Sequence, residues 1–119
     1  MQKYVSVVKG DNSISVCLYI EDEKLMRIGE KMEEINPEAY MNGYNWEAFL
    51  NYYLEKYEPD LLEGMNTDPE AGMYCAYYDY SEENEQKADQ FAKLLEKLVE
   101  EENELYRIVQ DEGDEIEWD

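Results

Sequence analysis

Hydrophobic and polar residues alternate along the first 20 positions of the chain, which predicts two β-strands. The apolar positions of segment 13–20 all fall on one face of an extended chain: Ile14, Val16, Leu18 and Ile20. Segment 3–9 is rich in β-branched residues, and Gly10-Asp11-Asn12 between the two segments is typical of a turn. Two such runs around a short polar turn indicate an antiparallel hairpin.

Three later segments repeat apolar residues every three or four positions, which is the spacing of an amphipathic helix. We expect helices over 21–34, 45–57 and 81–99, with Asn45 and Ser81 as the N-caps of the last two. The most regular stripe belongs to the middle helix: Trp46, Phe49, Leu50, Tyr53, Leu54 and Tyr57. This spacing predicts a buried face, which should share one core with Phe91 and Leu95.

Shorter elements fill the remaining segments. Pro59 to Glu63 predicts one further helical turn, residues 66–70 predict a loop, and residues 71–78 predict a third, central strand. Three consecutive glutamates at 100–102 should break the long helix before a short helix that ends near Gly113. The sequence therefore predicts a single α+β domain over residues 1–119. Its small antiparallel sheet, the N-terminal hairpin plus a third strand, would be covered on one face by helices.

Composition adds a large acidic excess, with a net charge of −21. The charge is zoned, because residues 38–85 hold twelve acids against the single base Lys56. Residues 100–119 hold ten acids against Arg107, and the rest of the chain is close to neutral. Such zones repel nucleic acid and anionic lipid and attract a basic partner. A solvated face that only aids solubility is the alternative reading.

Several kinds of site are disfavoured by the residues present. The chain has no histidine, which removes the commonest general base and transition-metal ligand. Asn66, Asp68 and Glu70 alternate as in the start of a calcium loop, but Ala71 stands where that loop needs glycine. We therefore expect no enzyme activity, no metal, no cofactor and no small-molecule substrate.

The start of the chain and the length of its apolar runs favour a cytoplasmic protein. The N-terminus does not resemble a signal peptide, and no apolar run is long enough to span a membrane. We expect a cytoplasmic protein in which Cys17 and Cys75 are buried thiols.

Tyrosines interleaved with acids favour a surface that docks onto a basic protein, since interfaces are enriched in tyrosine. Within residues 38–85 the candidate partner-binding residues are Tyr52, Glu55, Glu58, Asp60, Glu63, Asp68, Glu70, Asp79 and Tyr80. They form a single patch if the loop ends gather on one side of the molecule. The acidic tail, residues 114–119, contains Ile116 and Trp118 and offers a second docking zone, or a segment that folds back onto the core. We expect its deletion to change binding little.

Three stretches resemble the immunity protein 51 family of bacterial polymorphic toxin systems: residues 42–49 (NGYNWEAF), 59–65 (PDLLEGM) and 68–74 (DPEAGMY). The resemblance implies an antitoxin that binds and neutralises a cognate toxin. Occlusion of a basic active site is the mechanism that the acidic surface favours, with no direct binding to nucleic acid or membrane. The alternative is an acidic nucleic-acid mimic or regulatory protein-binding module with another basic target.

Overall fold

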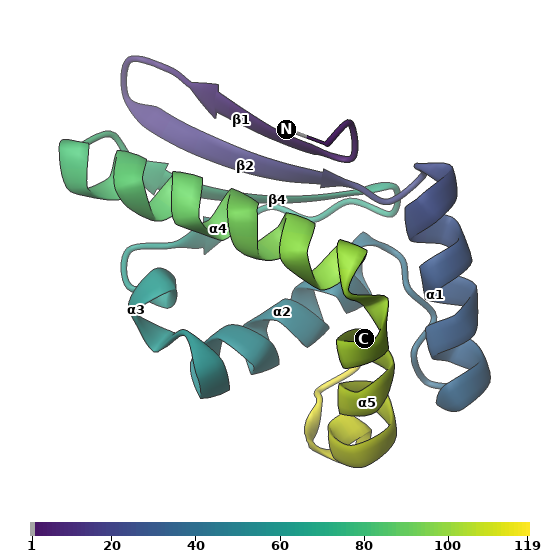
Figure 1. The fold of residues 1–119 in the computed structure, drawn as a ribbon. Coiled ribbons are helices and arrows are strands. Elements are labelled where there is room, and N and C mark those ends of the chain that lie inside the picture. Colours follow the sequence, from purple (N-terminus) through teal and green to yellow (C-terminus); the bar gives the residue numbers. More distant parts are fainter. Residues whose placement is uncertain (1) are drawn as a thin grey trace.

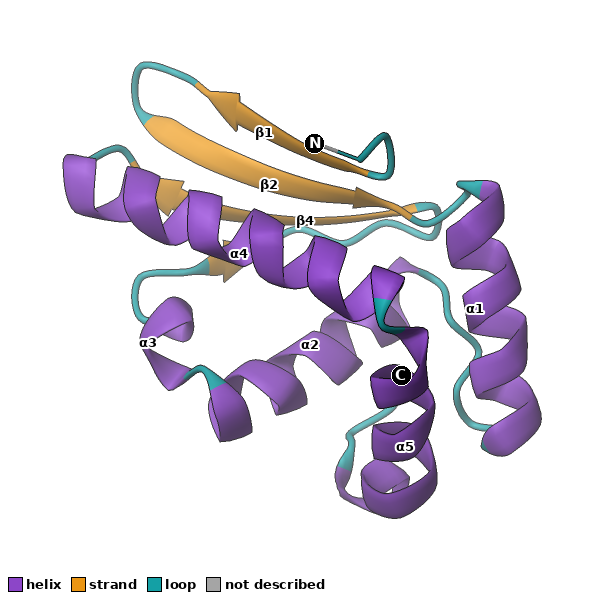
Figure 2. Cartoon of the chain, in the orientation of Figure 1, coloured by secondary structure: helices purple, strands orange, loops and turns teal. Residues whose placement is uncertain are grey.

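The computed structural model describes residues 2–119, which fold into one antiparallel sheet with all helices on one side of it (Figure 1). The strands are β1 (Val5–Lys9), β2 (Ser13–Tyr19), β3 (Asn66–Thr67) and β4 (Met73–Asp79). The helices are α1 (Glu23–Ile35), α2 (Gly43–Tyr57), α3 (Pro59–Leu62), α4 (Glu82–Glu100) and α5 (Glu102–Glu112), followed by the 3₁₀ turn η1 (Gly113–Glu115). The predicted α+β class is therefore confirmed (Figure 2).

The sheet has the strand order β1-β2-β4-β3, so the predicted third strand is central, as expected. The prediction of only three strands was wrong, because Asn66 and Thr67 pair with Tyr77 and Ala76 in a short fourth strand. Two residues are too few for an alternating pattern, which explains why this strand could not be read from the sequence.

The hydrophobic core lies between the sheet and the helices. Ile14, Val16 and Leu18 of β2 are fully buried on the helix side, as the alternating pattern predicted. Trp46 and Phe49 of α2 share this core with Phe91 and Leu95 of α4, which confirms the predicted packing. Helix α4 lies across the sheet, and α1 packs against α5 at one end (Figure 1).

Most of the predicted helix signals are confirmed. Ser81 caps α4 by accepting a hydrogen bond from the Asn84 amide, and the chain breaks between α4 and α5 at Glu101. Gly64, with a φ of 79°, ends the turn of α3 in a backbone conformation that favours glycine.

The N-terminus of α2 differs from the prediction. Its N-cap is Asn42, whose side chain accepts a hydrogen bond from the Asn45 amide at 2.9 Å, and the helix begins at Gly43 rather than after Asn45. The extra turn requires glycine at position 43, because a side chain there would overlap the carbonyl oxygens of Glu70 and Met73. Asn45 is buried within the first turn of α2, and its side chain does not cap the helix.

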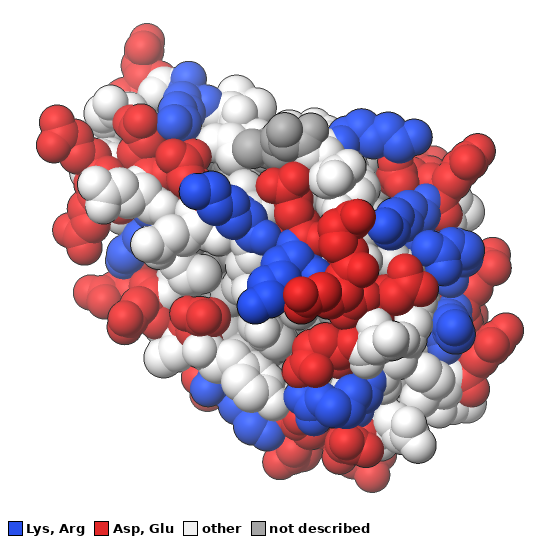
Figure 3. Space-filling model, in the orientation of Figure 1, with Lys and Arg blue, Asp and Glu red and all other residues white. Residues whose placement is uncertain are grey.

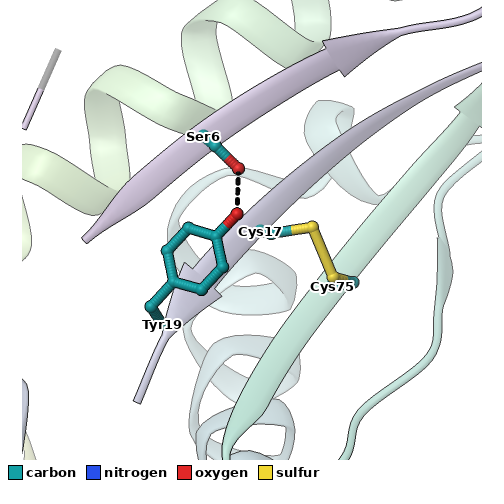
Figure 4. Close-up of a disulfide and its surroundings, with 4 residues drawn as sticks. All are labelled: Ser6, Cys17, Tyr19 and Cys75. Atoms are coloured by element: carbon teal, nitrogen blue, oxygen red, sulfur yellow. Dashed lines mark hydrogen bonds between the residues drawn. A yellow bond between two sulfur atoms is a disulfide. The ribbon is translucent and has the colours of Figure 1, made fainter. Parts of the chain in front are cut away.

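The side of the sheet opposite the helices carries a disulfide between Cys17 and Cys75 (Figure 4). The two residues are directly opposite in β2 and β4, with Cα atoms 4.3 Å apart, the spacing of a pair that shares no backbone hydrogen bond. The expectation of two buried thiols was therefore wrong. Sequence alone could not show that two strands 58 residues apart would pair in this register. Among the described residues, no helix is long and apolar enough to cross a membrane.

Candidate functional site: an acidic hollow between helix α2 and the C-terminal segment

A hollow of about 540 Å³ lies between the outer face of α2 and the last five residues of the chain. We call it the acidic hollow. Its acidic lining residues come from both acidic zones: Glu47, Glu55, Glu115, Glu117 and Asp119. The aromatic lining residues are Tyr44, Tyr52 and Trp118, and the smaller Ala48 and Asn51 complete it. The fold thus joins two acidic zones that are far apart in the sequence.

The C-terminal segment forms one wall because it folds back against α2 (Figure 1). Ile116 is buried in the core, and the Trp118 indole donates a hydrogen bond to the Gly113 carbonyl at 3.1 Å. The Asp119 amide donates to the side-chain oxygen of Asn45 at 2.6 Å. Of the two outcomes considered for the tail, the structure shows the folded-back one.

Asn45 connects this segment to the loop before α2. Its amide nitrogen donates to the Tyr40 carbonyl at 2.8 Å, while its oxygen accepts from Asp119. The side chain is 3% exposed, so these hydrogen bonds satisfy a polar group that would be costly to bury alone. Asn45 therefore fixes the position of the C-terminus relative to residues 38–45.

A second connection between α2 and the C-terminal part centres on the buried carboxylate of Glu112. It accepts hydrogen bonds from the hydroxyl groups of Tyr52 at 2.6 Å and Tyr57 at 3.0 Å, and from the Arg107 guanidinium at 3.3 Å. The Lys56 ammonium completes the contact with both a hydrogen bond and an ion pair. These donors come from α2 and α5, so Glu112 holds the two helices together beside the hollow.

The charges around Glu112 determine its ionisation. Hydrogen bonds from Lys56 and Tyr52 lower the pKa of Glu112 to about 2, so the carboxylate stays charged at neutral pH. Burial, together with the hydrogen bond to Glu112, raises the pKa of Tyr52 to about 12, so its hydroxyl remains a donor. Lys56 is the basic residue of α2, and it forms an ion pair with Glu112 rather than with the acids of the hollow.

The acids that line the hollow are largely uncompensated. Glu47 accepts a hydrogen bond from Thr67 at 2.6 Å, and Glu115 accepts one from Tyr52 at 3.1 Å. Among residues 2–119, no acid that lines the hollow takes part in an ion pair. On the face where α4 lies, by contrast, basic and acidic side chains are interspersed (Figure 3). The hollow is therefore a negative site with aromatic walls.

The structure brings only two of the nine predicted partner-binding residues to this hollow, Tyr52 and Glu55. Glu58, Asp60 and Glu63 lie between the end of α2 and the residue after α3. Asp68 lies beside Cys75 in the middle of β4, and Glu70 pairs with Met73 at the start of that strand. Asp79 and Tyr80 lie at the opposite end of β4. The seven-residue strand β4 is about 20 Å long and separates Glu70 from Asp79, so the nine residues are spread over at least that distance.

The sequence prediction missed the contribution of the tail and of the first turns of α2. Tyr44, Glu47 and Asn51 of α2 line the hollow and are not among the candidate residues selected from the sequence. Glu115, Glu117, Trp118 and Asp119 had been assigned to a separate zone. The sequence feature that indicates a folded-back tail is the pair Ile116 and Trp118, two apolar residues separated by one acid. Such a pattern indicates a segment with one buried side.

The chemistry of the acidic hollow suits the binding of a basic group. Within the described residues there is no group of three or more acids or cysteines placed to hold a metal ion. The hollow combines several carboxylates with aromatic rings, which suits the ammonium and guanidinium groups of a basic partner.

Comparison with known proteins identifies one family. The family model described as immunity protein 51 matches residues 5–114, which is nearly the whole chain and contains all three stretches noted in the sequence. Neither the curated proteins nor the solved structures contain a match.

Proposed function

Because the chain belongs to the immunity protein 51 family, we propose that it neutralises a cognate toxin by covering a basic surface of that toxin with the acidic hollow. The observation that supports this proposal is the meeting of both acidic zones around one aromatic-walled hollow. A basic toxin surface would be attracted by the field of these acids and would find aromatic side chains on which to pack.

Occlusion is the mechanism that follows from these properties. A toxin that acts on nucleic acid needs a positively charged site to hold phosphates, so a nuclease is the toxin class that fits best. The acidic hollow would occupy the place of the phosphates and exclude the substrate. The protein acts as a stoichiometric inhibitor in this proposal, without turnover.

The docking surface is tested by reversing charges inside and outside the hollow. Glu55→Lys together with Glu117→Lys places two positive charges in the hollow. Glu34→Lys together with Glu101→Lys changes the net charge equally at two exposed positions elsewhere. Toxin binding is measured by calorimetry, with a candidate toxin domain sought among the neighbouring genes.

We expect the hollow variant to bind roughly 100-fold more weakly or worse, since like charges brought together at an interface cost several kcal/mol. The outer variant should lose affinity only by slower association, because distant charges contribute to steering. If both variants bind equally well, the hollow is not the docking surface. If the unaltered protein neither binds the toxin nor protects cells that express it, the proposed function itself is refuted.

A further inference from the structure

A second hollow, of about 510 Å³, lies on the outer side of α1, and we call it the α1 groove. Its apolar lining residues are Ile20, Met26, Gly29, Tyr40 and Met41, with Ala71 and Gly72 from the turn before β4. Ile20 and Met41 are nearly inaccessible and form the floor, while Met26 and Tyr40 are 52% and 63% exposed. Among the described residues, Tyr40 is the most exposed large hydrophobic side chain, and it stands at the edge of this groove.

Glycines shape two sides of the groove. A Cβ at Gly29 would lie 3.0 Å from the Cβ of Met41, so glycine allows the loop before α2 to lie directly on the helix. A side chain at position 72 would collide with the carboxylate of Glu21. Glycine at this position therefore allows Glu21 to lie beside the groove. Gly29 therefore determines how closely Met41 approaches α1, and Gly72 determines where the rim residue Glu21 lies.

Charges on α1 are sorted between its two sides. The bases face the end of α4 and α5: Lys24 pairs with Glu100 of α4 at 2.7 Å, Arg27 pairs with Glu102 of α5 at 3.1 Å, and Lys31 lies 5.0 Å from the centre of the Tyr106 ring. The acids Glu21, Glu30 and Glu33 line the groove, and within residues 2–119 none of them takes part in an ion pair. The groove therefore has an apolar floor and an uncompensated acidic rim.

The segment 40–45 places the α1 groove beside the acidic hollow. Tyr40 lines the groove, Tyr44 lines the hollow, and both lie within five residues at the start of α2. Asn45 binds the Tyr40 carbonyl on one side and the Asp119 amide on the other, so the two sites are held in a fixed relation. A single partner that covers the start of α2 would contact both.

We propose that the toxin inserts an apolar side chain, flanked in its own sequence by lysine or arginine, into the α1 groove. The apolar side chain would pack between Met26 and Tyr40, and the flanking bases would meet Glu30 and Glu33. An apolar centre inside a charged rim is the usual anatomy of a protein interface. A second copy of this chain is a poor occupant, because it would bring a net charge of −21 against an acidic rim. The inference rests on the proposed function, since it names a second contact with the same toxin.

The experiment compares groove variants with matched controls and uses the same candidate toxin domain. Met26→Ala and Tyr40→Ala remove the two exposed walls, and Val8→Ala and Tyr77→Ala remove exposed apolar groups from the sheet. Glu33→Lys reverses a rim charge, and Glu34→Lys reverses its neighbour outside the groove. Binding rates are measured on immobilised toxin, and thermal melts confirm that each variant is folded.

We expect Met26→Ala and Tyr40→Ala each to weaken binding roughly 5- to 30-fold, mainly through faster dissociation, with little change in Val8→Ala and Tyr77→Ala. Glu33→Lys should weaken binding at least about tenfold more than Glu34→Lys, because only Glu33 lies against the flanking bases. The inference is overturned if the unaltered protein binds the toxin while the groove variants bind no worse than the controls. Failure of the unaltered protein to bind would instead refute the proposed function. Met26 lies on the surface of a helix, so its alanine variant keeps the test valid if Tyr40→Ala does not fold.

Discussion

Replacing Glu112 with glutamine removes the charge that holds α2 to α5 while it keeps the size of the side chain. Hydrogen bonds to a charged group contribute about 1.5–3 kcal/mol each, and Tyr52, Tyr57, Lys56 and Arg107 all donate to this carboxylate. The Lys56 and Arg107 side chains are 45% and 44% exposed, so solvent weakens their share. Since glutamine retains part of the hydrogen bonding, we expect a loss of about 2–3 kcal/mol at pH 7.

A chain of this length should then melt roughly 6–15 °C lower, which differential scanning calorimetry resolves easily. Glu115→Gln is the matched control. Glu115 also accepts a hydrogen bond from Tyr52, at 3.1 Å, but it is exposed, so its replacement should change stability by less than about 0.5 kcal/mol.

The difference between the unaltered protein and Glu112→Gln should depend on pH. The pKa of Glu112 is about 2 in the folded protein, because of its hydrogen bonds from Lys56 and Tyr52, whereas an unfolded glutamate titrates near ~4.3. As the pH falls, the unfolded chain takes up the proton first, so stability is lost between these two values. The difference should be constant from pH 7 to about 5 and fall to roughly half by pH 3. A difference below about 1 kcal/mol at pH 7, or one independent of pH in this range, would refute the assigned role of Glu112.

Three further predictions test the core, the disulfide and the tail. Phe49→Ala should cost about 3–5 kcal/mol in a urea melt, because Phe49 is fully buried, and a loss below about 1 kcal/mol would show that the stripe of α2 is not the core contact. Reduction of the Cys17–Cys75 disulfide should cost about 2–4 kcal/mol in the same assay, and identical melts with and without reductant would show that the bond does not constrain the chain. Truncation after Glu115 removes Trp118 and one wall of the acidic hollow, so toxin binding measured by calorimetry should weaken about tenfold or more, in contrast to the small change expected from the sequence. Unchanged affinity would show that the tail does not contribute to docking and would favour the zone chosen from the sequence, residues 38–85.

Much of the fold could be predicted because each local signal agreed with the final packing. The alternation in β2 and the stripe of α2 reflect which side of each element meets the core, and both periods are visible in the sequence. Ser81 and Gly64 could be assigned for a similar reason, since the cap and the positive φ are local backbone requirements.

Features that depend on distant contacts could not be predicted. Asn42 and Asn45 are equally good caps by residue type, and the choice between them depends on Gly43 fitting against the turn before β4. The pairing of Cys17 with Cys75 depends on strand register, as does the strand β3. The disulfide also counts against the expected cytoplasmic location, because reducing compartments keep most cysteines as thiols.

Part of the lining of the acidic hollow could be predicted from the sequence, and the rest could not. Acids and surplus tyrosine indicated a basic partner, and Tyr52 and Glu55 do line the acidic hollow. The remaining walls come from a tail whose path is set by Asn45 and Ile116, contacts that span much of the sequence. Residues at the two ends of β4 looked close because the chain returns there, yet the length of the strand separates them.

Titration of toxin activity with increasing amounts of this protein tests the central claim most directly. Toxin turnover is followed at a fixed toxin concentration well above the dissociation constant, so that binding is complete at each addition. Neutralisation by occlusion predicts a linear loss of activity that ends sharply at one equivalent, and the activity should return when the complex is separated by high salt. Full protection at a small fraction of an equivalent, or activity that does not return, would show that the protein modifies the toxin and would contradict inhibition by binding.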